Sequence, residues 1–532
     1  MDLQKKAKNT GRRQRVILFL MIFTLLSGSM VHSQTPDPTI SKLFQNSYRV
    51  IDGMRLSGGI YLDALAINTG PKPAALAANG VGLISLCIAD AMYKKTGDAV
   101  NWDSKAESKA LKTINEWIRL KNTTGATNVN GLFHRYFNPA NGAWVWVTEH
   151  STIDNAILAT GFLFCRNYFN QNAEIVEKTN TLLNSMDFTA AIPPSGNSMY
   201  MILDDKGIGS APTTPFNEYL VLAWWAKNSN SAFSGYNRAQ TYWNTYYSDA
   251  NKLPRYNYPD GNPILSEGTK SAQPSFHVQF SYYYCHYFGN DQNYMTYFAN
   301  QATADRTWWQ NNTAQQIAWG CGAGEIPGGN YSADAVNNNP NKIVSPHIMA
   351  GFSTVYPEVR NDLIALYNNG SGSAVYKIPN TNYEFLWRYK FAIPAQRASY
   401  VQAVDFSTML YGLAALPEYL GPEFFKMYND FNFVTSASAS ELSGDYELLK
   451  VFPNPAENQV EIQFNLPVGG TVLMEVTSAK GSLMKQLINR KMASGQHTIR
   501  WNVDAGIESG IYFCRMKIEN QSYITQKLMI TK

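Results

Sequence analysis

Residues 151–169 read STIDNAILATGFLFCRNYF, and this stretch decides the predicted fold. Its apolar residues recur at three- and four-residue spacing, which predicts an α-helix. Apolar side chains lie on nearly every face, so we expect this helix to be buried all round. Residues 216–226 share this character, whereas 109–122 and 173–187 carry charges along one face. We therefore predict inner helices of the first kind and outer helices of the second.

The same spacing runs from about residue 40 to residue 431. One or two helices are expected between 40 and 67, and the clearest of the others span 75–95, 109–122, 151–169, 173–187, 216–229, 237–249, 275–289, 291–313, 345–369, 402–419 and 421–431. Six antiparallel pairs of helices around one axis form an (α/α)6 toroid, which fits a mainly α chain with few β-runs better than a simple bundle. The long connections 189–214, 251–274 and 314–344 are then rim loops, and loops of this length usually carry function.

The composition is that of a large globular protein. A chain of 532 residues predicts one large domain and a small one. Hydrophobic residues at 45% and charged residues at 16% exclude a polytopic membrane protein and a disordered polyelectrolyte. Aromatic residues reach 13%, and flat rings are suited to line a ligand cleft. A large helical core with Tyr-rich seams explains them equally well.

The basic character of the chain is confined to its start. Residues 1–33 contribute +5 to the formal charge of +4, so the remainder carries −1 and gives no case for a nucleic-acid partner. The basic residues precede the apolar run 16–26 and small residues up to Ser33, which predicts a cleaved signal peptide over 1–33. An uncleaved anchor is the alternative, but the run is shorter than the roughly 20 residues of a spanning helix. We expect no membrane span after cleavage.

Neither a cofactor nor a metal site is predicted. The five cysteines are far apart, odd in number and set among apolar neighbours, as expected of small buried side chains. Cys-x-x-Cys pairs, Cys/His ligand spacings and Gly-rich phosphate loops are absent from the sequence. His150, His286 and His347 lie among apolar or helix-start residues and are interpreted as core or capping groups.

A second kind of pattern follows a polar linker over 432–446. Strict alternation, as in Val460, Ile462 and Phe464, predicts strands, and turn signals such as Ser494-Gly495 separate them. Residues 447–532 are therefore expected to form a small antiparallel β-sandwich of about seven strands. A carbohydrate-binding sandwich is the alternative to the function suggested next.

This tail resembles the type A C-terminal sorting domain of the Bacteroidetes type IX secretion system. The resemblance rests on VFPNPA at 451–456, SGIY at 509–512, and the closing Lys527 and Lys532. It implies passage across the outer membrane by the type IX secretion machinery. The protein would then be released or held at the cell surface.

Three acidic positions in the main region could carry chemistry. Hydrolysis of a glycosidic bond needs one carboxylic acid and a second carboxylate. Glu149 with Asp154, Glu218, and Asp405 each lie in or near a predicted first helical turn. Capping explains such positions as well, since Ser151-x-x-Asp154 is a capping box. The helix dipole also lowers a carboxyl pKa, so a general acid at Glu218 requires partial desolvation.

The main region, 40–431, resembles the glycoamylase-like family that includes bacterial endo-β-1,2-glucanases. The motifs that carry this resemblance occur in the family's order: FHRYFNP (133–139), STIDNAIL (151–158), FNEY (216–219), FHVQFS (276–281), WGCGAG (319–324) and QAVD (402–405). It implies a secreted glycosidase that cleaves a β-linked glucan, β-1,2-glucan by resemblance, with inversion. Glu218 would be the general acid, and Asp405 the base that acts on water.

The same resemblance implies the residues that bind the sugar. Asp154 and Glu149 would line the subsite before the cut. The hydroxyl partners would be His134, Arg135 and His277, and the aromatic platform could include Trp144, Trp146, Trp319 and Trp387. Glu325 stands where the family usually has Asp, and the run around His277 also departs from the family pattern. Linkage specificity therefore stays open.

Two other functions remain open at this point. A polysaccharide lyase can use the same toroid, but it would want a Tyr/His base and a basic cleft for uronic acids. A non-catalytic surface glycan-binding protein could keep the fold without the chemistry.

Overall fold

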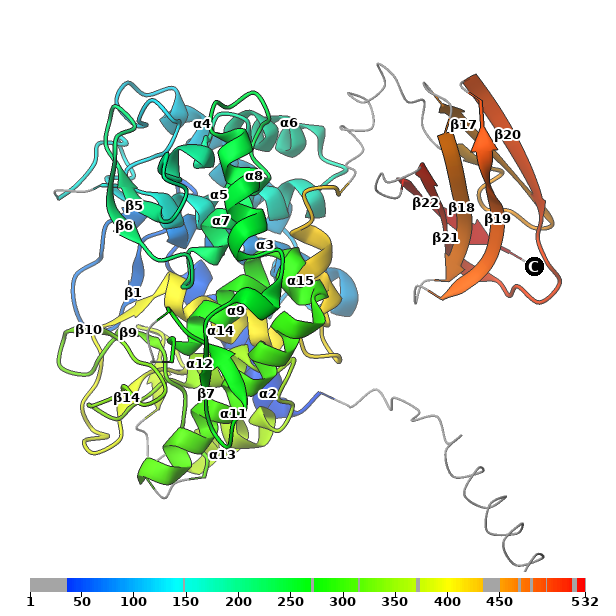
Figure 1. Ribbon diagram of the computed structural model, residues 1–532. Coiled ribbons are helices and arrows are strands. Elements are labelled where there is room, and N and C mark those ends of the chain that lie inside the picture. The colour runs from blue at the N-terminus through cyan, green and yellow to red at the C-terminus, as the bar shows by residue number, and fades with distance from the viewer. Residues whose placement is uncertain are drawn as a thin grey trace, which may run out of the picture.

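The computed structural model describes residues 36–146, 149–268, 272–313, 316–369, 374–433, 450–466, 470–478, 482–493, 495–518 and 524–531. The predicted signal peptide and most of the predicted linker lie outside these residues. Helices occupy the N-terminal part of the described chain, and antiparallel strands occupy the C-terminal part, as predicted (Figure 1).

Six helices form the inner wall of the helical region. They are α3 (Leu76–Thr96), α5 (Thr152–Tyr168), α7 (Leu220–Lys227), α9 (Ser275–Tyr284), α12 (Pro346–Gly351) and α14 (Ala403–Ala414). Each contacts the next in this order, and α14 contacts α3, so the contacts close a ring. Nearly all of their residues are buried, as expected for helices with apolar side chains on every face.

A second set of helices packs outside this ring. It consists of α2 (Pro38–Asp52), α4 (Ala106–Lys121), α6 (Ala173–Leu183), α8 (Tyr236–Tyr246), α11 (Gln292–Thr313) and α13 (Val359–Asn369). In α4 the buried residues Ala106, Ala110, Ile114 and Trp117 follow three- and four-residue spacing, while its charged residues lie outside. Inner and outer helices alternate along the chain, so all six inner helices begin at the same end of the ring.

The opposite end of the ring is closed by aromatic packing. Helix α15 (Glu423–Tyr428) contacts α5, α9 and the short α10 (His286–Asn290). The ring of Phe425 lies 6.1, 5.0 and 5.3 Å from those of Phe164, Tyr283 and Tyr411, in the C-terminal halves of three inner helices. In the described part of the chain, this packing closes the end where the inner helices finish and leaves the end where they begin open to a ligand.

Several predicted helices differ from the structure. The predicted helices 173–187 and 402–419 end earlier, at Leu183 and Ala414. The predicted helix 345–369 is two helices, α12 and α13, because the chain turns over 352–358, which contain Pro357. The predicted helix 275–289 breaks at Cys285, whose backbone is extended, and continues as α10. Helix α7 begins at Leu220 rather than at 216, so Glu218 lies in the turn before it.

Short strands form the rim at the open end (Figure 1). The short paired strands of the helical region are β1 (Ala64–Ala66) with β15 (Tyr400–Gln402), β2 (Ala74–Ala75) with β3 (Tyr136–Phe137), β9 (Ala323–Glu325) with β10 (Tyr331–Ala333), β11 (Ile343–Val344) with β14 (Tyr389–Lys390), β12 (Val375–Lys377) with β13 (Glu384–Leu386), and β5 (Met199–Leu203) with both β4 (His150–Ser151) and β6 (Gly209–Thr213). The pair β7 (Arg255–Asn257) and β8 (Pro263–Leu265) packs along the outer helix α11. Strands β2, β4 and β15 lead directly into α3, α5 and α14. The predicted rim loops thus carry strands that hold the chain around the inner helix starts.

The C-terminal region forms two antiparallel sheets. One has the order β16 (Lys450–Phe452), β17 (Gln459–Leu466), β20 (Gly495–Asn502), and the other has the order β19 (Leu483–Met492), β18 (Gly470–Ser478), β21 (Gly510–Ile518), β22 (Ile524–Ile530). Residues from both sheets, such as Val460, Ile462, Met474 and Val476, share one hydrophobic core. This core is separate from that of the helical region. The predicted β-sandwich of seven strands is confirmed.

Two observations bear on burial. Of the described helices, α3 alone has the length and composition of a membrane span, but most of it is buried inside the protein, as in other core helices.

The five cysteines are buried and free, which confirms that they act as small apolar side chains.

Candidate active site

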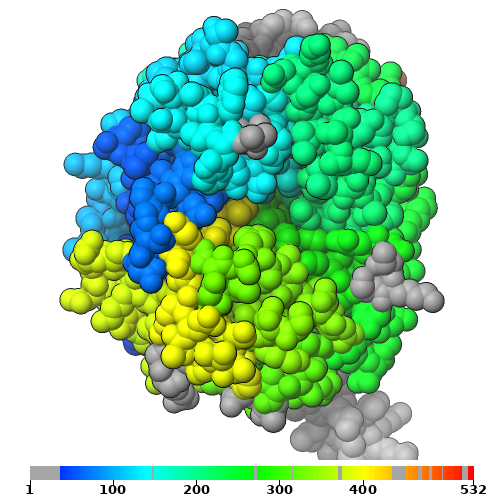
Figure 2. Space-filling model, turned by 90° about the vertical axis from the view of Figure 1, so that its left-hand side faces the viewer, coloured from blue at the N-terminus to red at the C-terminus, as the bar shows by residue number. Residues whose placement is uncertain are grey.

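The predicted site residues gather at the open end of the ring. Asp154, His277 and Asp405 lie in the first turns of α5, α9 and α14, and Glu218 lies in the turn before α7. Figure 2 shows the rim face hollowed near its middle, where blue, cyan, green and yellow parts of the chain meet. Closure of the ring thus brings together residues that are far apart in sequence.

Glu218 forms an ion pair with His277. Its Oε2 lies 2.7 Å from Nε2 of His277, and its side chain is 29% exposed while that of His277 is 5% exposed. Burial raises the pKa of Glu218, but the charge and hydrogen bond of His277 outweigh it, so the net shift is downward. Nδ1 of His277 lies 3.9 Å from Oε1 of Glu267. The predicted acid therefore sits in a carboxylate–imidazole–carboxylate row.

Asp405 is a buried carboxyl at the start of α14. The Tyr331 hydroxyl donates a hydrogen bond to its Oδ1 at 3.1 Å, and its Oδ2 is buried without a partner among the described residues. Burial raises the pKa of Asp405 to about 7, although the positive charge of Arg388 and the Tyr331 hydrogen bond act in the opposite direction. Asp405 is therefore poised to change charge near neutral pH.

Arg388 is a fully buried charge behind Asp405. Its guanidinium forms a salt bridge with Asp334 and donates hydrogen bonds to the backbone oxygens of Gly322, Gly324 and Ser332. These contacts fix the β9–β10 hairpin, which carries Tyr331, over the start of α14. The functional candidates did not include Arg388, although an arginine inside the apolar run 385–389 is a signal that could have revealed it.

Arg135, Glu149 and Asp154 form a second cluster of predicted residues. Arg135 Nη1 lies 3.3 Å from Glu149 Oε1, and its Nε lies 3.3 Å from Asp154 Oδ2. The carboxylates raise the pKa of Arg135, chiefly through Asp154. Ser151 is the N-cap of α5, and its Oγ accepts a hydrogen bond from the Asp154 backbone N–H at 3.4 Å, which is one half of the predicted capping box. The Asp154 carboxylate instead contacts the Ser151 hydroxyl and Arg135, so Asp154 belongs to the charged cluster.

Asp63 links this cluster to Asp405, and the sequence analysis missed it. Burial raises the pKa of Asp63 to about 6, with a smaller upward effect from Asp154, and Arg135 opposes both. Asp63 in turn raises the pKa of Asp405. Its backbone oxygen accepts the Ala403 N–H at 3.0 Å, which ties it to the start of α14. Asp63 follows no helical spacing and starts no helix, so the sequence carries no signal for it.

The four predicted platform tryptophans separate into two pairs. Trp144 and Trp146 are 54% and 60% exposed, and their rings pack on His134 and Tyr136. Trp319 and Trp387 are 1% and 0% exposed. Their indole nitrogens donate hydrogen bonds to Asp362 and to a backbone oxygen. The expectation that Trp319 and Trp387 stack on a sugar is therefore corrected, because neither ring presents a face to solvent.

Glu325 is likewise more enclosed than a sugar ligand would be. Its side chain is buried, and Oε1 accepts the Ser399 backbone N–H at 2.7 Å. Its own N–H donates to Oε1 of Gln402 at 3.0 Å. These bonds tie β9 to the strand before α14, so Glu325 supports the wall of the site. His286 and His347 pack against Trp224 and Trp387, as the core interpretation predicted.

Comparisons with known proteins agree with both parts of the fold. Residues 450–531 match a family profile described as Secretion system C-terminal sorting domain. No curated protein sequence matches the chain. The helical region is similar to a solved endo-β-1,2-glucanase from Chitinophaga pinensis, with a TM-score of 0.59, 15% identity, and coverage of 73% of this chain and 94% of that one.

Two further structures have the same fold. A Bacteroides uniformis protein whose name proposes a glucoamylase has a TM-score of 0.60 and 15% identity, and the match covers 74% of this chain and 94% of that one. A β-1,2-glucanase from Parabacteroides distasonis has a TM-score of 0.55 and 14% identity, with coverage of 74% and 60%. At these identities the similarity establishes the fold. The chain is thus a helical region with the fold of these proteins, followed by a secretion sorting domain.

Proposed function

We propose that the protein is a secreted, inverting glycoside hydrolase that cleaves a β-linked glucan, with β-1,2-glucan as the substrate to test first. The observation that carries the proposal is the location of Glu218 and Asp405 at the same end of the helical ring, just before α7 and in the first turn of α14. Their surroundings include the Arg135 cluster, Asp63 and the exposed rings of Trp144 and Trp146. Carboxyl groups beside exposed aromatic rings suit hydrolysis of a neutral sugar chain.

In the proposed mechanism Glu218 protonates the leaving oxygen. His277 favours the ionised form of Glu218, so the proton for catalysis is held by the Glu218–His277 pair rather than by an isolated carboxyl group. Donation to the glycosidic oxygen leaves ionised Glu218, which stays in contact with His277. The close contact of the two side chains makes this proton available in the cleft.

Asp405 accepts the proton of the attacking water. Its pKa of about 7 makes it a competent base above neutral pH. Tyr331 covers Asp405 from the rim and donates a hydrogen bond to it, so the proton must reach the carboxylate past the Tyr331 hydroxyl. Attack by water on the face opposite the leaving group inverts the anomeric centre.

The decisive experiment compares Glu218→Gln and Asp405→Asn on two substrates. On linear β-1,2-glucan, each variant is expected to lose about 10²–10⁴ in kcat. On an aryl glycoside with a good leaving group, Glu218→Gln should recover most of its rate, because that leaving group needs no proton. Asp405→Asn should stay slow on both substrates. The anomer released first, observed by proton NMR, tests inversion.

Glu116→Gln is a matched control, since Glu116 lies on the outer helix α4 and pairs with Arg119. The hydrolase proposal fails if the wild type and both site variants bind glucan equally and none generates reducing ends. That result would indicate a surface glycan-binding protein. Products that absorb ultraviolet light would indicate a lyase, although the described site holds more carboxylates than basic groups and so suits uronic acids poorly.

The domain organisation is part of the proposal. Residues 1–33 would direct export as a signal peptide, 40–431 would carry catalysis, 432–446 would be a linker, and 447–532 would address the protein to the type IX machinery. The match over 450–531 supports secretion to the medium or the outer surface.

A further inference from the structure

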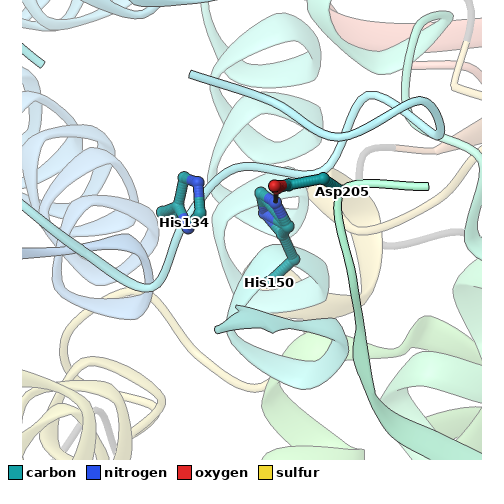
Figure 3. A group of neighbouring side chains, drawn as sticks. All are labelled: His134, His150 and Asp205. Atoms are coloured by element: carbon teal, nitrogen blue, oxygen red, sulfur yellow. Dashed lines mark hydrogen bonds and ion pairs between the residues drawn. The ribbon is translucent and has the colours of Figure 1, made fainter. Parts of the chain in front are cut away.

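His134, His150 and Asp205 form a cluster on the rim (Figure 3), and His134 and His150 are the chain neighbours of Arg135 and Glu149. His150 belongs to β4, which pairs with β5, and Asp205 lies in the turn between β5 and β6. His134 comes from the segment before β3. Its neighbour Arg135 donates a backbone hydrogen bond to Glu149, the neighbour of His150. Three separate segments therefore converge on this point.

The potential ligand atoms of these three side chains are close together. His150 Nε2 lies 3.0 Å from Asp205 Oδ1, and the rings of His134 and His150 have centroids 3.9 Å apart. One ligand atom from each residue lies within 4.8 Å of the other two. A tetrahedral metal ion with bonds of about 2.1 Å holds its ligands roughly 3.4 Å apart. Small side-chain rotations would therefore complete such a site.

The burial of these groups suits a metal site better than a simple core contact. The His150 side chain is 2% exposed, whereas Asp205 is 83% exposed, so one ligand is fixed and another is free to rotate toward an ion.

Asp205 holds the His150 ring through a hydrogen bond to Nε2. Because Asp205 is a side chain in solvent, an ion can take its place as the partner of this nitrogen.

We propose that His134, His150 and Asp205 bind one divalent transition-metal ion, with Zn²⁺ the best match to two nitrogen ligands and one oxygen ligand. Water would fill the remaining position. This site could not be predicted from the sequence, because positions 134, 150 and 205 follow no metal-ligand spacing and come together only in the fold.

The ion would act on the rim rather than on the sugar. It would join the turn of the β5–β6 hairpin to the segments that carry Arg135 and Glu149. It would also fix His134, on whose ring Trp144 packs with a centroid distance of 4.7 Å. Metal binding is therefore expected to stiffen the wall that presents Trp144.

Metal titration of the full-length protein after chelator treatment and dialysis tests the proposal. Zn²⁺ measured by calorimetry, and Co²⁺ measured by its visible absorption, should bind with one ion per chain. Asp205→Asn should weaken binding at least tenfold without harming the fold, because Asp205 is exposed. His134→Ala should weaken it further. Excess Zn²⁺ should raise Tm by a few degrees in the wild type and less in either variant.

Asp260→Asn is the matched control, since Asp260 is an exposed aspartate in a different rim turn. It should bind Zn²⁺ like the wild type. The proposal is overturned if the wild type binds no ion at millimolar Zn²⁺, or if Asp205→Asn and His134→Ala both retain wild-type affinity. Because these readouts need no glucan, they are independent of the hydrolase proposal.

Discussion

The buried position of Asp405 determines both its pKa and the role proposed for it. It lies in the first turn of a helix, where the dipole favours a carboxylate, yet its surroundings remove it from water and raise its pKa to about 7. Glu218 is more exposed to solvent, and its contact with His277 lowers its pKa instead. The sequence indicated both acids as site residues. It could not indicate the direction of either shift, because His277 and Tyr331 reach them only through the fold.

The pH dependence of kcat/KM should report the titration of Asp405. As the proposed base, Asp405 must be ionised, so the rate is expected to fall as pH drops below about 7. Tyr331→Phe removes a hydrogen bond that favours the ionised form, so the acidic limb should move to higher pH. Tyr383→Phe, on an exposed ring outside the site, serves as the control. An acidic limb that stays in place in Tyr331→Phe would contradict the assignment.

The raised pKa of Asp405 predicts that ionisation of this residue destabilises the folded protein. A carboxyl whose pKa is about 7 in the folded state and about 3.9 unfolded contributes stability below pH 4 that is lost as pH rises to 7. Asp405→Asn abolishes this titration, so the variant should be more stable than the wild type at pH 8, by up to about 4 kcal/mol. Near pH 4 the two should differ little. Urea unfolding at both pH values measures the difference, and a gap independent of pH would refute the linkage.

At the scale of elements, the helices were predictable and their ends were not. Apolar residues on nearly all faces identified α5 and α7 correctly as inner helices, because burial on every side produces that pattern. The breaks at Cys285 and over 352–358 depend on packing and loop geometry that leave no periodic signal. Site residues on helix starts, such as Asp154, were found for the same reason. Asp63 and Tyr331 lie on rim segments without periodicity and were missed.

The contact between α3 and α5 depends on two glycines. A Cβ added to Gly80 would lie 2.2 Å from the Ile157 backbone oxygen, and one added to Gly161 would lie 2.7 Å from the Gly80 Cα. Neither backbone can move without shifting an inner helix. Gly80→Ala and Gly161→Ala are each expected to lower the free energy of unfolding by about 3 kcal/mol.

Chemical denaturation of each variant measures this effect. Gly58→Ala is the matched control, because a Cβ there would meet nothing within 4 Å and the backbone is compatible with alanine. Its stability should equal or slightly exceed that of the wild type. If Gly80→Ala is as stable as the wild type, α3 and α5 can move apart without cost. That result would contradict the close packing of these two helices.

At the scale of the whole molecule, the chain holds two separate hydrophobic cores. One is built from helices and rim strands over residues 40–425, and the other from the strands after residue 450. The change from three- and four-residue spacing to strict alternation predicted this division, because the two periods cannot belong to one kind of element. Ring closure could not be derived from spacing, since it depends on contacts between helices that are distant in sequence.

Two cores predict two unfolding transitions in calorimetry of the intact protein. Each core buries its own apolar surface, so each should unfold cooperatively and independently of the other. The Asp405→Asn variant allows a β-1,2-linked glucotriose to be added without turnover. At 100 times its Kd the ligand should stabilise the helical region by about 2.7 kcal/mol, which raises only the larger transition, because the cleft is built entirely from the helical core. A single transition, or an equal shift of both, would mean that the two cores are coupled. The C-terminal region would then fold as one unit with the helical region rather than as an independent domain.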